Sequence, residues 1–169
     1  MAIATMTQAN APAGATDSDL LVAHDLQKWF PIRKGFWSRV VGHVKAVDGV
    51  SFTVRQGETL GLVGESGCGK TTTSRLVMRA YDPTGGTIHF RDRKLGWVNI
   101  PTASSSELRD VRRNVQMIFQ DPYGSLNPRM TLRDIIGEPL LVNGVASGSA
   151  LEDRVAELLR LVGRSEEHT

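Results

Sequence analysis

Hydrophobic residues alternate with polar ones, or form short continuous runs, in several segments that this pattern predicts as strands. Residues 20–30 (LLVAHDLQKWF) and 46–54 (AVDGVSFTV) have the composition and alternation of strands in an antiparallel sheet. Residues 59–63 (TLGLV) and 115–119 (VQMIF) are short apolar runs, which are typical of strands buried on both faces. Residues 87–90 add another short strand after a turn rich in glycine and proline.

Helices are predicted where start signals precede apolar residues. The segment over residues 70–81 is expected to turn its apolar residues inward, namely Leu76, Val77 and Ala80. Ser104 and Glu107 stand at capping-box spacing and predict a helix over residues 105–113. Thr131 with Asp134 resembles another cap and opens a helix through Ile135 and Ile136.

The last helix has the clearest pattern. Ser149 and Glu152 form a predicted capping box, and the apolar residues that follow fall on one helical stripe. The stripe contains Leu151, Val155, Leu158, Leu159 and Val162. We expect this face to pack on a core, because surface helices are ordinarily amphipathic for that reason.

The composition excludes several classes of protein. The 169 residues are 40% hydrophobic and 22% charged, which excludes wholesale disorder. One cysteine excludes a disulfide scaffold, and no apolar run is long enough to span a bilayer. The net charge of +2 is too small to indicate a nucleic-acid partner, and we expect none. These features predict a soluble domain from a reducing compartment.

Residues 64–71, GESGCGKT, match the phosphate-loop pattern G-x-x-x-x-G-K-[ST] and lie between a predicted strand and a predicted helix. Glycines allow backbone N–H groups to converge on one polyphosphate, and the helix adds its positive end. Lys70 would reach the β- and γ-phosphates, and the Thr71 hydroxyl would bind Mg²⁺. The predicted nucleotide-binding residues of this segment are Gly64, Glu65, Ser66, Gly67, Cys68, Gly69, Lys70, Thr71 and Thr72.

Cys68 has two interpretations. It fills space in the loop, or it is a reactive thiol, since a helix N-terminus lowers the pKa of a nearby thiol.

A second landmark follows residues 115–119, where Gln120 ends the apolar run and Asp121-Pro122 comes next. That position is the carboxyl edge of a sheet, where ligands sit in α/β folds.

Three segments together resemble the ATP-binding subunit of ABC transporters, and more narrowly the oligopeptide, dipeptide and nickel importer branch. They are VKAVDGVSF from residue 44, GETLGLVGESGCGKTT from residue 57, and FQDPYGSLNPRMT from residue 119. The resemblance covers about residues 20–163. It implies that Gln120 contacts Mg²⁺ and links ATP binding to the transmembrane partner. It also implies that an aromatic residue stacks on adenine, for which we choose Phe30, with Trp29 as the alternative.

The resemblance implies an α/β fold: a P-loop NTPase of ABC type, with a mixed sheet, an N-terminal antiparallel β-subdomain and the start of a helical subdomain. It implies ATP and Mg²⁺ as cofactors, and an ATPase that drives solute import from the cytoplasmic face of the membrane. The implied partners are transmembrane permease subunits, a second ATP-binding subunit and, indirectly, a solute-binding protein. A soluble NTPase or kinase and an inert nucleotide-binding module remain the alternatives.

The sequence contains no LSGGQ-type signature and no apolar strand ending in paired acidic residues of a Walker B motif. We therefore expect a truncated, hydrolysis-incompetent chain that lacks catalytic carboxylates. The expected organisation is a disordered tail over residues 1–19, the N-terminal part of the ATP-binding domain over 20–163, and a non-native tail over 164–169. The tail is interpreted as an artefact because RSEEHT corresponds to the translation of a widely used sequencing-adapter oligonucleotide.

Overall fold

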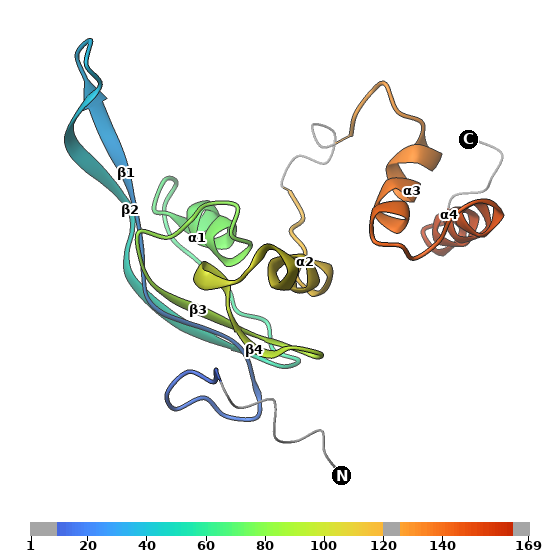
Figure 1. The fold of residues 1–169 in the computed structure, drawn as a ribbon, viewed down its shortest axis with the longest axis horizontal. Helices are drawn as coiled ribbons and strands as arrows, with labels where there is room; N and C mark the ends of the chain where they lie inside the picture. Colours follow the sequence, from blue (N-terminus) through green and yellow to red (C-terminus); the bar gives the residue numbers. More distant parts are fainter. Residues whose placement is uncertain (1–9, 120–125, 164–169) are drawn as a thin grey trace. The chain divides into compact units, whose positions relative to one another are not determined.

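A computed structural model describes residues 10–119 and 126–163 of the chain. The chain divides into two compact units, Met1–Met117 and Ile118–Thr169, which are described separately (Figure 1). Two predictions concern segments outside the described residues, namely the role of Gln120 and the nature of the tail over residues 164–169. Residues 1–9 of the predicted N-terminal tail also lie outside them.

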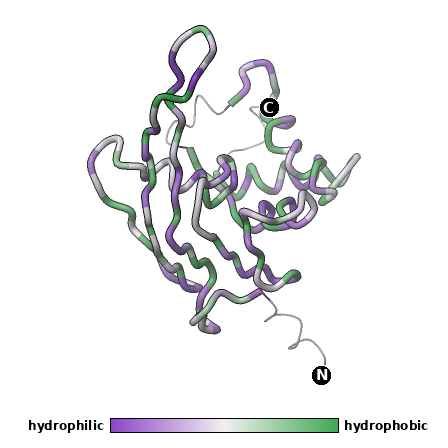
Figure 2. The backbone as a smooth tube through the Cα atoms, turned by 60° about the vertical axis from the view of Figure 1, so that its left-hand side comes forward, coloured by the Kyte–Doolittle hydropathy of each residue, from purple (hydrophilic) through white to green (hydrophobic). Residues whose placement is uncertain are grey.

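The first unit is built on one antiparallel sheet with the strand order β2-β1-β3-β4 (Figure 1). The strands are β1 (Asp19–Lys34), β2 (Arg39–Arg55), β3 (Gly85–Asp92) and β4 (Gly96–Asn99). Figure 2 shows hydrophobic and hydrophilic residues alternating along these strands, which is the pattern of a sheet with one buried face. The antiparallel part of the predicted fold is confirmed.

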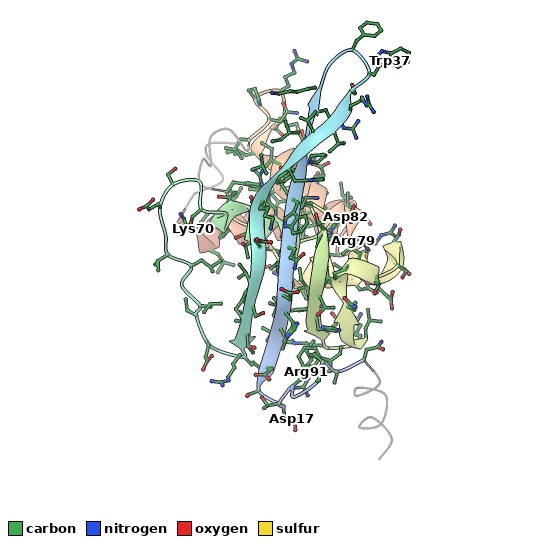
Figure 3. The ribbon with its side chains drawn as sticks, turned by 90° about the vertical axis from the view of Figure 1, so that its left-hand side faces the viewer. Asp17, Trp37, Lys70, Arg79, Asp82 and Arg91 are labelled. Atoms are coloured by element: carbon green, nitrogen blue, oxygen red, sulfur yellow. The ribbon has the colours of Figure 1, made fainter. Side chains whose placement is uncertain are left out.

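Residues just before β1 are tied to the sheet. The Gln56 backbone N–H donates to the Ser18 carbonyl over 2.8 Å, and Arg91 of β3 donates to the Asp17 carbonyl and pairs with its carboxylate. Figure 3 shows Asp17 and Arg91 together at one end of the sheet. The ordered part of the first unit therefore begins before β1, inside the segment for which the sequence predicted a disordered tail.

A bulge in β1 changes the partners of this strand. The pairing register shifts between Ala23 and Leu26 against β2, and Asp25 between them has a left-handed φ of 47°. A Cβ atom on Gly86 of β3 would lie 2.2 Å from the Asp25 carbonyl oxygen, so only glycine fits opposite the bulge. Beyond Gln27, β1 leaves β3 and pairs with β2 alone.

One hydrophobic core joins the sheet to two helices, α1 (Lys70–Val77) and α2 (Ser105–Asn114). Leu76 of α1 is completely buried in that core, as predicted, whereas Ala80 lies beyond the helix and is exposed. The predicted capping box of α2 is present, since Ser104 accepts the Glu107 N–H and Glu107 accepts the Ser104 N–H. A short 3₁₀ helix, Ile100–Thr102, connects β4 to α2.

Two arginines fasten the end of α1 to its surroundings. The Arg112 guanidinium on α2 donates to the carbonyls of Met78 and Arg79, which follow α1. Carbonyls at this end of a helix have no N–H group from a following turn to accept from, so the guanidinium takes the place of that donor. Arg79 in turn donates to the Ala103 carbonyl over 2.7 Å and pairs with Asp82, beside which it lies in Figure 3. These contacts fix the position of α1 through its C-terminal end.

The second unit contains α3 (Leu132–Val142) and α4 (Ser149–Leu161). Thr131 caps α3 by accepting the Asp134 N–H, as predicted. The predicted capping box of α4 is wrong, because Gly148 is the N-cap and the Glu152 carboxylate instead accepts from Arg133 of α3 over 2.8 Å.

Part of the apolar stripe of α4 forms the core of the second unit. Leu151, Val155 and Leu159 are buried, and the side chains of α3 and the connecting loop that pack on them are Ile136, Leu140 and Ala146. Leu158 is half-buried and Val162 is exposed, so the stripe predicted from spacing is wider than the buried face. Across the described ranges, no helix is both long enough and apolar enough to cross a membrane.

The two buried strands predicted over residues 59–63 and 115–119 are wrong for this structure. Both segments lack strand pairing, and Val63 and Ile118 are 94% and 97% exposed. A strand exists only when a neighbouring backbone satisfies its N–H and C=O groups, and none of the described residues pairs with either segment. The parallel part of the predicted mixed sheet is therefore not formed among the described residues.

Asp92 joins three parts of the first unit. It is only 3% exposed, and its carboxylate accepts from the backbone N–H groups of Lys94 and Leu95 at 2.8 and 3.0 Å and from the Asn114 amide at 2.6 Å. Burial acts to raise the pKa of Asp92, but these hydrogen bonds outweigh it and lower the pKa below its usual value. The charged form of Asp92 therefore stabilises the β3–β4 turn and the end of α2.

Replacing Asp92 by alanine should lower the free energy of unfolding by about 2–3 kcal/mol at pH 7, because three part-buried hydrogen bonds lose their acceptor. Since the folded-state pKa is lowered, this contribution is complete above the unfolded pKa of about 3.9 and disappears as pH falls through the folded value. Urea unfolding at pH 7 and pH 3 measures both effects.

The Asp110→Ala variant is the matched control. Asp110 forms an exposed pair with Arg113 three positions along the same helix, so its loss should cost under about 1 kcal/mol. An Asp92→Ala effect no larger than that of Asp110→Ala, or one that persists unchanged at pH 3, would contradict this role.

Candidate phosphate-binding site

The predicted phosphate loop leads into α1, and α1 starts in close contact with β2. Its N-cap is Gly69, which has a left-handed φ of 97°. A Cβ atom on Gly69 would lie 2.2 Å from the Ala46 carbonyl oxygen and 3.6 Å from the Val47 side chain. The second glycine of the motif is therefore required both by its backbone conformation and by the close approach of the two segments.

Lys70 folds back over the loop. Its ammonium Nζ donates to the carbonyls of Gly64 and Glu65, both over 2.7 Å, and lies 3.5 Å from the Cys68 Sγ. These contacts place the charge of Lys70 at the centre of the loop, on the exposed side of the first unit shown in Figure 3. The same ammonium group is a compact positive charge, and it could bind a ligand that carries negatively charged oxygens.

The start of α1 offers backbone donors. No side chain caps it, whereas α2 and α3 are capped by Ser104 and Thr131. The first intrahelical acceptor is the Gly69 carbonyl, which binds the Thr73 N–H over 2.8 Å. The N–H groups of Lys70, Thr71 and Thr72 precede that bond, so they belong to the helix end that attracts anions. Of the other predicted donors, Cys68 N–H is engaged by the Glu65 carbonyl at 3.3 Å.

Cys68 is exposed in the loop and packs beside Gly64. A Cβ atom on Gly64 would lie 2.7 Å from the Cys68 Sγ, so the first glycine of the motif makes room for this thiol. This contact agrees with the interpretation of Cys68 as a loop filler. The alternative, a reactive thiol, stays a prediction.

The two candidate aromatic residues lie on adjacent positions of β1 and have different surroundings. Trp29 is held by its indole N–H, which donates to Asp48 over 3.0 Å, and the Lys45 ammonium lies 4.5 Å from its ring centre. Phe30 is half-buried and meets the edge of the Tyr81 ring at a centroid distance of 5.6 Å.

Asp48 and Tyr81 were not predicted as part of this region from the sequence. No pattern marked Asp48, because its partners Lys45 and Trp29 meet only after β1 and β2 pair. The hydrogen bond from Lys45 is the main cause that lowers the pKa of the Asp48 carboxyl. Burial acts to raise this pKa, and the hydrogen bond from the Trp29 indole adds a smaller lowering. Tyr81 is the last residue of the helix predicted over residues 70–81, but α1 ends at Val77, and the contact of Tyr81 with Phe30 depends on that earlier end.

The predicted magnesium ligands are only partly described. Thr71 is exposed in the first turn of α1, next to Lys70, and Gln120 lies outside the described residues. Across residues 10–119 and 126–163, no three His, Cys, Asp or Glu side chains are grouped to hold a metal ion. A hydroxyl oxygen beside an anion-binding loop suits Mg²⁺, which usually takes few protein ligands and completes its shell with phosphate oxygens and water.

A glycine-rich loop, a lysine at its centre and a helix start without a side-chain cap define a phosphate-loop protein. Residues 47–169 match the family described as "ABC transporter", and the chain belongs to that family. The resemblance inferred from the sequence is thereby confirmed.

Curated relatives agree with this assignment. The chain is 49% identical over 150 residues to "Oligopeptide transport ATP-binding protein AppF" of Bacillus subtilis (strain 168), covering 88% of this chain and 44% of that protein. It is 46% identical over 149 residues to "Glutathione import ATP-binding protein GsiA" of Escherichia coli (strain K12), covering 88% of this chain and 23% of that protein. The chain thus spans less than half the length of each of these relatives.

Solved structures confirm the fold class. Two dimeric structures of the ATP-binding cassette MJ0796, one of them in a post-hydrolysis state bound to ADP and Pi, match with a TM-score of 0.66 and 21% identity. Each match covers 87% of this chain and 59% of the solved chain. At this identity the likeness establishes an ABC ATPase fold and nothing about the ligand of this chain.

Replacing Gly69 by alanine should lower the free energy of unfolding by about 3 kcal/mol or more. The left-handed φ costs about 1–2 kcal/mol for a residue with a Cβ atom, and the contact with the Ala46 carbonyl adds about 1–3 kcal/mol. Gly57→Ala is the matched control, because Gly57 has a φ of 79° and no other atom would lie within 4 Å of a Cβ at this position. Urea unfolding should show a loss of only about 1–2 kcal/mol for that control; equal losses would refute the contact.

Proposed function

We propose that this chain binds ATP through residues 20–163, which form the N-terminal part of the ATP-binding domain of a subunit, and that the whole subunit couples ATP hydrolysis to solute import. The observation that carries the proposal is the Lys70 ammonium, placed over the carbonyls of Gly64 and Glu65 at the uncapped start of α1. The names of the relatives AppF and GsiA support import of peptides or related solutes.

Residues 64–72 would act on the phosphates through their backbone and through Lys70. When ATP enters, the Lys70 ammonium exchanges its two carbonyl partners for phosphate oxygens, and the N–H groups at the start of α1 donate to the same phosphates. Mg²⁺ would supply a second positive charge on the phosphates, held by the Thr71 hydroxyl and by Gln120. This arrangement binds and orients the phosphates without needing a carboxylate in the loop.

We place adenine on Phe30 rather than on Trp29, because the indole N–H of Trp29 is already bound to Asp48. Each ring has an ammonium near it, that of Lys45 at 4.5 Å from the Trp29 ring centre and that of Lys28 at 5.1 Å from the Phe30 ring centre, and Phe30 also meets Tyr81 edge-on. Phe30 pairs with Val44 on β2, two residues from the Ala46 carbonyl against which the phosphate loop rests. That spacing along β2 suits a nucleotide with its base on β1 and its phosphates at α1.

Hydrolysis and transport need groups that this sequence does not contain. The 169 residues contain no LSGGQ-type signature and no apolar strand ending in paired acidic residues, so we propose that ATP binding by this chain alone does not lead to hydrolysis. We propose that transmembrane permease subunits, a second ATP-binding subunit and a solute-binding protein complete the transporter. The subunit would act at the cytoplasmic face of the membrane.

Lys70→Ala should weaken binding of a fluorescent ATP analogue at least about tenfold in the presence of Mg²⁺, because a charge-assisted contact is worth about 1.5–3 kcal/mol. The control is Lys94→Ala, which removes an exposed lysine from the β3–β4 turn and should leave the affinity unchanged. Circular dichroism checks that both variants fold as the wild type does. Equal affinity of Lys70→Ala and wild type, with both folded, would overturn the proposal. Measurable steady-state ATP hydrolysis by this chain alone would contradict the proposal that hydrolysis needs acidic groups from outside these 169 residues.

Phe30→Ala should weaken ATP binding roughly fivefold while leaving the affinity for inorganic tripolyphosphate unchanged, because it removes a ring contact and no charge. Trp29→Ala is the matched variant at the next position of β1 and should alter ATP affinity less than about twofold. Competition titrations with both ligands separate base from phosphate contacts. The reverse result would assign adenine stacking to Trp29.

A further inference from the structure

The β1–β2 hairpin projects beyond the sheet as a two-stranded ribbon. Pairing of β1 with β3 ends at Gln27, while pairing with β2 continues to Lys34 opposite Arg39. Figure 3 shows this ribbon extending past the rest of the sheet, with Trp37 at its tip and Lys70 well away from it. A two-stranded ribbon has little stability of its own in water, so a projection of this length is unusual without a partner.

The tip exposes two aromatic rings. Phe36 and Trp37 are 99% and 86% exposed, and their rings meet edge-to-face at a centroid distance of 6.4 Å. The turn beneath them is ordered by the Ser38 N–H, which donates to the Gly35 carbonyl over 3.1 Å. Further exposed apolar side chains continue down the ribbon, namely Ile32, Val40, Val41 and Val44.

Cationic side chains stand directly behind these rings. Residues 31–45 contain Arg33, Lys34, Arg39 and Lys45 and no acidic residue, whereas the rest of the chain has 16 Lys and Arg against 18 Asp and Glu. Arg33, Lys34 and Arg39 are exposed and have no carboxylate partner within the part of the chain that the structure describes. The ribbon is thus the place where positive charge is concentrated on a nearly neutral chain.

We propose that the hairpin tip, residues 31–44, docks on a membrane surface that contains anionic lipids. Tryptophan and phenylalanine favour the depth of the lipid headgroups, and each cation near an anionic leaflet adds attraction. The order along the ribbon, rings at the leading end and cations behind, matches the order of a bilayer from acyl boundary to headgroup charge. Single-stranded nucleic acid also binds aromatic and cationic residues, but along a concave groove, and this tip is convex.

The docking tip shares no residue with the phosphate loop. Lys70→Ala should therefore bind vesicles as the wild type does, and failure of nucleotide binding would leave the lipid proposal standing. The converse also applies, since replacing Phe36 and Trp37 by serine should leave the affinity for ATP unchanged. The two proposals can fail independently.

The test is co-sedimentation of the full chain with vesicles of phosphatidylcholine alone and with phosphatidylglycerol added. The chain should partition into the anionic vesicles and much more weakly into the neutral ones, and added salt should reduce the binding. Lipids brominated in the upper acyl chain should quench Trp37 fluorescence. In Trp37→Phe that quenching should disappear while partitioning stays within about twofold.

Two variants separate the contributions of rings and charges. Phe36→Ser with Trp37→Ser, and Arg33→Ala with Lys34→Ala and Arg39→Ala, should each lower partitioning into anionic vesicles about tenfold. The matched control is Arg93→Ala with Lys94→Ala, which removes two exposed cations from the other tight turn of the sheet and should change partitioning less than about threefold.

Several results would overturn the proposal. Partitioning that is equal for wild type and both tip variants would assign vesicle binding to other exposed apolar residues, such as Val63 and Ile118. Equal binding to neutral and anionic vesicles would show that the cationic side chains of the tip do not contribute to binding, which contradicts the proposal. Retention on an oligonucleotide or heparin matrix without partitioning into vesicles would assign the tip to a polyanion instead.

Discussion

The close approach of α1 to β2 is the constraint on which the candidate site depends. Because a Cβ atom on Gly69 would lie only 2.2 Å from the Ala46 carbonyl oxygen, the helix start can approach the sheet this closely only with glycine at this position. The core around Leu76 and the guanidinium of Arg112 secure the other end of the helix. The loop between residues 64 and 69 is therefore presented by a helix that is held at both ends, which suits a site built from backbone donors.

Short-range signals in the sequence predicted the parts of the fold that short-range contacts determine. Ser104 and Thr131 cap their helices because the partner N–H groups lie three residues away in the same chain segment. The capping box at Ser149 failed for a tertiary reason, since Arg133 on a different helix attracts the Glu152 carboxylate. The same distinction applies to strands only in part: β1 pairs with β2 and β3 with β4, each the next strand in the chain, but β1 also pairs with the distant β3. The apolar runs at 59–63 and 115–119 find no partner among the described residues.

The motif predicted the loop but not its surroundings. Gly64, Gly69 and Lys70 are placed by a spacing that phosphate chemistry itself requires, so the pattern was sufficient to find them. The environments of Trp29 and Phe30 depend on the register of β1 against β2 and on Asp48 and Tyr81, which no local pattern marks. The molecule also handles charge in two ways, with one lysine and backbone dipoles at the loop and with several long side chains at the hairpin tip.

The bulge at Asp25 limits how this architecture can change in length. Side chains on a strand alternate between the two faces of the sheet. A single-residue insertion just before Leu26 would therefore move its side chain from the core to the opposite face. Gly86 leaves no room to absorb such a shift, because its backbone already touches the Asp25 carbonyl. Beyond Gln27 the ribbon meets no third strand, and residues could be added or removed there in cross-strand pairs. Among relatives, length variation should therefore gather in the ribbon and avoid the bulge.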